Sequence, residues 1–281
     1  MRLKANHSNT KYPYFCGKLN NLNASMEKKE TLKKIASIAA MVVFFIIISY
    51  LYLFPLLEGK EIAQHDIQSH IGMSKELADF RKATGEEAIW TNSMFGGMPG
   101  YMISVRYDSN LLNRVHGWLV TLFHPASMIL LYLLGFYILL TSLKAGRLPA
   151  LAGALAYGFS TYLIIIIQAG HNSKAYALGY LVMVIAGVLM AYRYDRRKGA
   201  LLFTVALALE ILVGHIQITY YGLLALLVFG ITELVYALRE KRSLPFLKTT
   251  GWLVAGALLA VAVNFSYLYS NYKFSKETIR G

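Results

Sequence analysis

The most regular feature of the chain is a series of long apolar stretches separated by shorter polar segments. About seven of them are long enough to cross a hydrocarbon layer of roughly 30 Å as an α-helix, which takes about 20 predominantly apolar residues. They cover residues 35–57, 125–143, 148–168, 176–192, 200–215, 218–238 and 249–269, and the fifth and sixth nearly touch at residues 214–217. The pattern predicts an all-α, polytopic membrane helix bundle.

The distribution of Lys and Arg predicts how this bundle is oriented. Hydrophobic residues make up 56% of the chain, yet the formal net charge is +13. The cations lie in alternate connections, and cationic loops favour the cytoplasmic side; they cluster at residues 28–34, 144–147, 193–198 and 239–248. We therefore expect a multi-pass protein of the cytoplasmic membrane with its amino terminus inside. Because the cations are spread over separate loops, the charge does not indicate a nucleic-acid partner.

The first 25 residues differ from the rest of the chain. They are polar and Asn-rich, without a hydrophobic period, whereas Met26 begins the sequence MEKKETLKK just before the first apolar stretch. Two interpretations remain open, a disordered amino-terminal extension and a natural start at Met26. Cys16, the only cysteine, lies in this segment, so the sequence predicts no disulfide framework. Residues 26–281 form the predicted membrane domain.

A large polar loop, residues 58–124, follows the first apolar stretch and is expected outside. Residues 66–84 mix apolar and charged positions, which favours one or two short amphipathic helices on the membrane surface. Residues 91–104, TNSMFGGMPGYMIS, are rich in Gly and Pro and favour a structured turn. Residues 109–123 return to helical spacing.

Several polar residues are candidates for chemistry at the outer surface. Asp66 follows the first span closely and could act as a base on a substrate at the membrane surface, although an exposed carboxylate is often only solvated. The turn HNSKA contributes His171, Asn172 and Lys174, which could hold an anionic leaving group or simply link two spans. Arg106 could contact a phosphate or end a surface strand.

Three further polar residues lie in or beside apolar stretches. Glu210, His215 and Gln217 would be costly in a membrane unless they face a cavity or find partners. If one helix continued through this region, Glu210 and Gln217 would share a face. They could then line a substrate cavity, bind a cation, or join helices through hydrogen bonds.

Several motifs in order resemble the amino-terminal part of the YfhO-like bacterial membrane proteins, which are assigned to the GT-C class of glycosyltransferases. The motifs that carry the resemblance are LFPLLEGK, GMSKELADFR, TGEEAIWTNSMFGGMPGY, AGHNSKA, HIQITYY and KETIRG. The resemblance runs from about Met26 to Gly281. Relatives of this type are longer, which implies that this chain is truncated at the carboxyl end.

The resemblance implies transfer of a sugar from a polyprenyl-phosphate donor to a lipid or glycopolymer acceptor of the cell envelope, on the outer face of the membrane. In that class the first outer loop commonly carries an acidic residue near the first span, and Asp66 is the residue that fits. No nucleotide-binding or zinc-protease motif occurs, so no cofactor is expected, with a divalent cation left open and no metal ligands assigned. The alternatives are a transporter or flippase, and an inert fragment that needs a missing carboxyl-terminal half.

Overall fold

The computed structural model describes residues 13–105 and 110–278, and it divides into two units, residues 1–48 and 49–281. Within these residues the fold is all-α except for one short pair of strands. Arg106 lies outside the described residues.

The first unit consists of most of helix α1 (Pro13–Tyr52). Its part from Met26 to Tyr52 is long and apolar enough to cross a membrane, as the sequence predicts. The helix begins at Pro13, so residues 13–25 are helical in the structure, and the two interpretations of the first 25 residues stay open. A helix that is already nucleated extends at little cost per residue, even through polar sequence.

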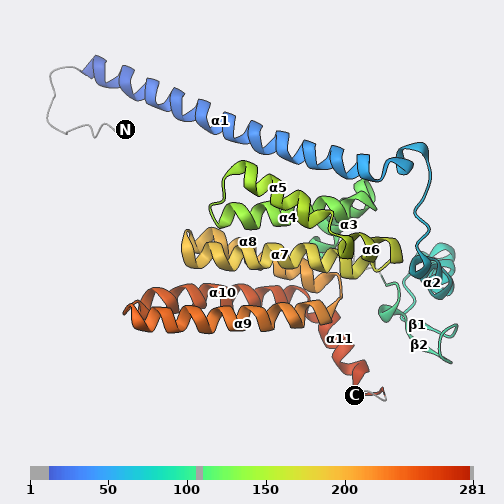
Figure 1. The fold of residues 1–281 in the computed structure, drawn as a ribbon. Helices are drawn as coiled ribbons and strands as arrows, with labels where there is room; N and C mark the ends of the chain where they lie inside the picture. Colours follow the sequence, from blue (N-terminus) through green and yellow to red (C-terminus); the bar gives the residue numbers. More distant parts are fainter. Residues whose placement is uncertain (1–12, 106–109, 279–281) are drawn as a thin grey trace. The chain divides into compact units, whose positions relative to one another are not determined.

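The second unit is a helical bundle with three visible layers (Figure 1). Helices α4 (Ala126–Ser142) and α5 (Arg147–Gly158) form one layer, and α7 (Asn172–Arg193) and α8 (Arg196–Leu212) form the middle one. Helices α9 (Ile216–Arg239) and α10 (Ser243–Val263) form the third. Shorter helices α3 (Leu111–Phe123), α6 (Thr161–Ala169) and α11 (Phe265–Ser275) complete the unit.

The core lies between α7, α8 and α10 and depends on small residues. A methyl group on Gly187 would lie 2.5 Å from the backbone nitrogen of Phe203, and one on Gly199 would lie 2.2 Å from that of Ala191. The backbones of α7 and α8 therefore approach too closely for any larger residue. Membrane helices pack in this way because lipid supplies no hydrophobic drive for their association, and close van der Waals contact does. Many apolar side chains of α9 and α10 are exposed, as expected for surfaces that face lipid.

Four helical segments are individually long and apolar enough to span a membrane: Met26–Tyr52, α7, α9 and α10. Two bent pairs, α3 with α4 and α5 with α6, also qualify when each is taken together, which raises the number to six. Helix α8 has 17 residues, at the lower limit for a span. The last predicted span, residues 249–269, is wrong in its bounds because α10 ends at Val263 and a separate helix, α11, begins at Phe265.

The loop of residues 58–124 contains a helix and a structured turn where the sequence predicts them, and the turn includes a short strand pair. Helix α2 (His65–Thr84) is followed by strands β1 (Trp90–Thr91) and β2 (Met98–Pro99), which pair antiparallel with Trp90 opposite Pro99. Short 3₁₀ helices η1 (Phe54–Glu58) and η2 (Gly100–Met102) lie on either side. The Glu76 carboxylate joins α2 to the strands, since it accepts hydrogen bonds from the Thr91 hydroxyl and from the backbone N–H groups of Asn92 and Ser93.

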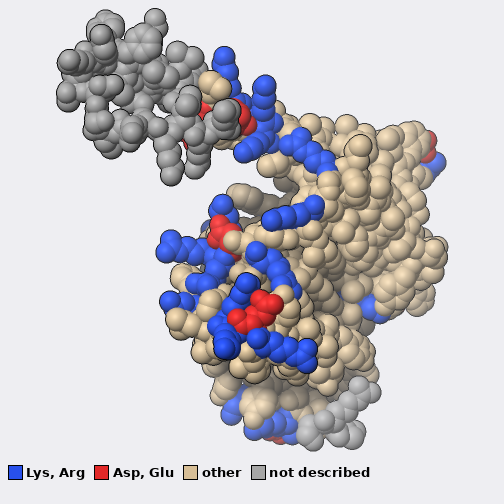
Figure 2. All heavy atoms as spheres, turned by 60° about the vertical axis from the view of Figure 1, so that its left-hand side comes forward, with Lys and Arg blue, Asp and Glu red and all other residues tan. Residues whose placement is uncertain are grey.

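The two ends of the second unit differ in charge. Helix α2 and the strands lie at one end (Figure 1), and the connections α4–α5, α7–α8 and α9–α10 lie at the other. Figure 2 shows Lys and Arg side chains gathered at this second end, around a few acidic ones. The arrangement agrees with the alternation of cationic loops along the sequence, and the side of the membrane that each end faces stays a prediction.

Candidate functional site

The amino-terminal end of α2 lies against the turn between α6 and α7. The Gln64 side chain is buried, and its Nε2 donates to the backbone oxygen of Ile167 at 2.5 Å and to Oδ1 of Asn172 at 3.1 Å. The turn itself depends on Gly170, which has φ +90. A methyl group on Gly170 would lie 3.1 Å from Cβ of Gln64 and 3.3 Å from Cβ of Asp66. Only glycine therefore fits without moving one of the two segments.

This docking brings Asp66 to His171. Oδ2 of Asp66 lies 2.8 Å from Nδ1 of His171, and Oδ1 lies 3.9 Å from Nδ1 of the neighbouring His65. The carboxylate and the His171 ring are each about half exposed, at 47% and 51% of the side chain, so both are open to a ligand. Two residues 105 positions apart in the sequence thus form one pair.

The local backbone around this pair favours an anionic ligand. Asp66 lies in the first turn of α2, and His171 caps the amino-terminal end of α7, so two positive helix ends meet at the pair. Lys174, in the first turn of α7, adds a cation, with its Nζ 5.4 Å from the centre of the Tyr162 ring. The carboxylate partly offsets this positive potential and remains the only acidic group of the cluster formed by Gln64, His65, Asp66, His171, Asn172 and Lys174.

His215 joins this cluster from the turn between α8 and α9. Burial is the main cause that lowers the pKa of His215, and the positive charges of Lys174 and His171 lower it further. Its Nδ1 is buried and has no hydrogen-bond partner among the described residues. His215 was predicted to line a cavity, and the structure places it beside the HNSKA turn.

Glu210 and Gln217 do not share a helix face. Helix α8 ends at Leu212 and α9 begins at Ile216, with Gly214 at φ +77 between them, so the continuous helix that such a face requires is absent here. Glu210 is fully buried and its Oε1 accepts a hydrogen bond from the Thr219 hydroxyl at 2.9 Å, which joins α8 to α9. Gln217 is exposed and lies near the Tyr221 hydroxyl.

A cavity of about 630 Å³ lies next to this cluster, between α3, α8, α10, α11 and the end of the outer loop. It borders the α8–α9 turn, since Leu212 and Tyr267 line it and a methyl group on Gly214 would lie 2.6 Å from the Tyr267 hydroxyl. Glu210, His215 and Gln217 are not among the described residues that line it, and their role in lining a substrate cavity stays a prediction.

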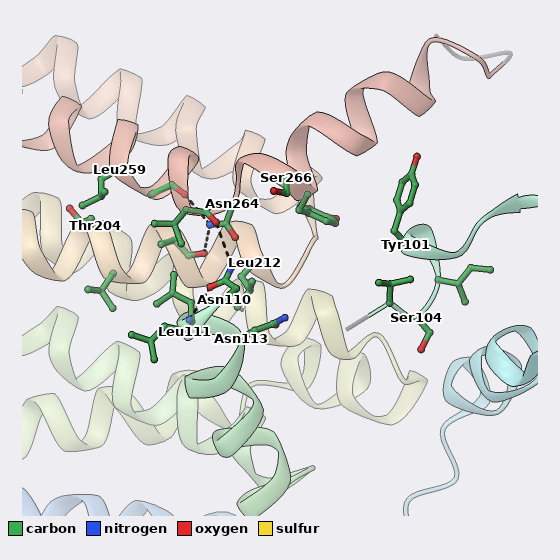
Figure 3. Close-up of a pocket in the computed structure, with 18 residues that line it drawn as sticks. Tyr101, Ser104, Asn110, Leu111, Asn113, Thr204, Leu212, Leu259, Asn264 and Ser266 are labelled. Carbon is green, nitrogen blue, oxygen red and sulfur yellow. Dashed lines mark hydrogen bonds between the residues drawn. The ribbon is translucent and has the colours of Figure 1, made fainter. Parts of the chain in front are cut away.

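Among the described residues, the lining of this cavity carries no charged side chain and combines apolar side chains with several amide and hydroxyl groups. Figure 3 shows Asn110 and Asn264 on the helix side and Tyr101 and Ser104 on the loop across from them. Asn264 is 2% exposed, and its Nδ2 donates to the backbone oxygens of Ala208 and Ala260, each at 2.9 Å. Because both partners are acceptors, they fix the amide orientation, and Oδ1 is left without a partner among the described residues.

The sequence did not single out Gln64, Gly170 or Asn264. Gln64 lies in no motif, Gly170 lies in the AGHNSKA motif without a chemical group to mark it, and Asn264 lies inside an apolar stretch that was expected to be one continuous span. An amide in such a stretch is the one available signal, because burying it is costly without partners. The described residues include no group of three or more His, Cys, Asp or Glu side chains arranged to hold a metal ion.

No protein-family model, curated protein or solved structure matches this chain. What the fold establishes is an all-α protein with four to six helices that could span a membrane.

Proposed function

We propose that this protein is a membrane glycosyltransferase of the GT-C class, or the amino-terminal part of one. In the proposed reaction a sugar passes from a polyprenyl-phosphate donor to a cell-envelope acceptor on the outer face of the cytoplasmic membrane. The observation that carries the proposal is the 2.8 Å contact between Asp66 and His171, which joins the first outer loop to the HNSKA turn.

In this mechanism Asp66 is the general base. An acceptor hydroxyl that attacks the anomeric carbon must lose its proton to a group within hydrogen-bond reach. His171 would hold one carboxylate oxygen of Asp66, which leaves the other free to accept this proton. The carboxylate is accessible enough for this role, because about half of its side chain is exposed.

The leaving group in the proposed reaction is a lipid phosphate, whose charge must be stabilised as the bond to the sugar breaks. Lys174 and the amino-terminal ends of α2 and α7 supply positive potential next to Asp66. One acceptor of Asn172 is already used by Gln64, so Asn172 would serve mainly to hold α2 in place. The cavity around Asn264 has no charged side chain among its described lining residues and borders the α8–α9 turn that carries His215, so it suits the apolar part of a lipid substrate or an uncharged acceptor.

The experiment is transfer of radiolabelled sugar from a panel of polyprenyl-phosphate donors, in membranes that contain the wild-type protein or Asp66→Asn at equal expression. The matched control is Asp79→Asn, because Asp79 lies on the same helix, is 62% exposed and pairs only with Lys75. We expect Asp66→Asn to lose about 10²-fold or more of the rate and Asp79→Asn to keep it. Equal rates in all three proteins would refute the role of Asp66.

A transporter or flippase is the second candidate, favoured by Glu210. This carboxyl group is fully buried, and its Oε2 has no partner among the described residues, as in a site that binds a coupling proton or cation. Reconstituted vesicles decide between the two. Transport of a lipid-linked substrate that is abolished by Glu210→Gln and unaffected by Asp66→Asn would favour transport over transfer.

A further inference from the structure

A second cavity, of about 260 Å³, lies at the opposite end of the bundle from Asp66, among the connections of α7 to α8 and of α9 to α10. Four charged side chains line it, namely Arg193, Arg196, Arg242 and Glu233. Three arginines against one glutamate leave an excess of two positive charges. The role of Asp66 in the proposed function makes no use of this cavity.

Glu233 is neutralised within the protein. It lies on α9, with only 10% of its side chain exposed, and its Oε1 is paired with Nη2 of Arg193 on α7. A buried carboxylate without such a partner would be strongly destabilising, so this ion pair is structural. Arg196 and Arg242 remain as the cations available to a ligand.

Arg196 is held in place by a neutral group. Its Nε donates to the Thr249 hydroxyl at 2.9 Å, and that hydroxyl in turn donates to the backbone oxygen of Pro245. Thr249 is 4% exposed, so the plane of the guanidinium is fixed against α10 while its Nη groups have no partner among the described residues. Arg242 also lines the cavity, and its ion pair with Glu240, at 3.5 Å with the arginine side chain 68% exposed, is a weak one that a phosphate can replace.

We propose that this cavity binds a phosphate group, and that the phosphate belongs to an anionic membrane lipid. A planar guanidinium with free paired N–H groups matches phosphate oxygens in geometry and charge. The site also lies where a lipid phosphate would be, at the ends of helices long enough to span a membrane. Leu238, Leu244 and Leu247, each about 60% exposed at the ends of α9 and α10, provide apolar contact for an acyl chain.

The lining contains features that a diffuse cationic surface does not need. Tyr192, Tyr194, Tyr236 and Phe246 also line the cavity, and aromatic side chains are favoured at the level of lipid headgroups. Exposed cations alone would attract anionic lipid weakly and without regard to position. Because Arg196 is hydrogen-bonded to the buried Thr249 inside a cavity, we expect the lipid phosphate to bind at one defined position.

The test is binding of fluorescent phosphatidylglycerol to the purified protein in a neutral detergent, followed by anisotropy. The variants are Arg196→Gln and Arg242→Gln. The matched control is Arg239→Gln, which removes an exposed cation from the last turn of α9 that does not line the cavity. We expect Arg196→Gln to raise the dissociation constant about ten-fold, the size of one charge-assisted hydrogen bond to phosphate, and Arg239→Gln to change it by less than about two-fold.

Further measurements identify the ligand and check that each variant is folded. Phosphatidylcholine should compete poorly because it has no net charge, and Arg196→Lys should restore only part of the affinity because it lacks the planar fork. Inorganic phosphate that displaced the lipid at similar concentrations would assign the site to a soluble phosphate and refute the lipid assignment. Thermal unfolding of each variant shows whether it is folded. Equal weakening by all three glutamine variants, or no binding of either phosphate source, would overturn the proposal.

Discussion

Replacing Gly170 by alanine should disrupt the docking of α2 more than any other single methyl group in the turn. Gly170 has φ +90, a left-handed conformation that costs a residue with a side chain about 1–2 kcal/mol. The new methyl group would also lie 3.1 Å from Cβ of Gln64 and 3.3 Å from Cβ of Asp66. Crowding of this kind costs about 1–3 kcal/mol, so the expected total with the conformational cost is roughly 2–5 kcal/mol.

The matched control is Gly85→Ala at the carboxyl-terminal end of the same helix. Gly85 has φ +76, and a methyl group there would meet nothing within 4 Å. It should therefore cost only the conformational part, about 1–2 kcal/mol. The assay is equilibrium unfolding of the purified protein in detergent, with the difference between the two variants as the quantity of interest.

The difference isolates the contact between α2 and the α6–α7 turn, because both variants share the backbone penalty. We expect Gly170→Ala to be the less stable by about 1–3 kcal/mol. If the two variants lost the same stability, Gly170 would not be packed against Gln64 and Asp66, and the contact between Asp66 and His171 would lose its structural basis.

Three other predictions concern stability. Hydrogen bonds from the Thr91 hydroxyl and the Ser93 backbone lower the pKa of Glu76 below its ordinary value. The contribution of Glu76 to stability is therefore present above the unfolded pKa and is lost as the pH falls through the folded pKa. Wild type should lose stability on acidification below about pH 4.5, and a pH series of unfolding curves should show a smaller loss in Glu76→Gln. Arg193→Ala should destabilise by about 3–5 kcal/mol, because it leaves the buried Glu233 carboxylate without its partner. The check is the unfolding of Arg193→Ala, Glu233→Gln and the double variant, and additive effects would mean that the pair does not interact. Asn264→Leu should destabilise the protein because it removes two hydrogen bonds that join α10 to α8 and to its own last turn; unchanged unfolding would contradict this role.

Much of the helical arrangement could be predicted from the sequence, because a membrane requires long apolar helices and leaves few other solutions. The bounds of α4, residues 126–142, differ from prediction by one residue at each end. The seventh stretch was predicted less well, since Asn264 interrupts it and uses its amide to join α8 and α10. Such a break depends on tertiary hydrogen bonds that a hydropathy pattern does not contain.

The candidate site could be predicted only in part. Asp66 and His171 were placed on the same side of the membrane by the alternation of cationic loops, which limits where they can meet. Their contact also needs Gln64, which hydrogen-bonds to the backbone oxygen of Ile167 at 2.5 Å, and Gly170, which leaves room for the close approach, and neither residue carries a reactive group that marks it in the sequence. A shared face for Glu210 and Gln217 was conditional on one continuous helix, and the break at Gly214, which has a positive φ, removes that condition.

The most direct test of the account is a double-mutant cycle on the rate of sugar transfer, with Asp66→Asn, His171→Gln and both together. Residues that act as one unit give strongly non-additive losses. We predict that the double variant is no slower than Asp66→Asn alone, because His171 acts by holding the Asp66 carboxylate. Losses that simply add on the free-energy scale, or transfer that neither substitution affects, would contradict the claim that this pair is the centre of the reaction.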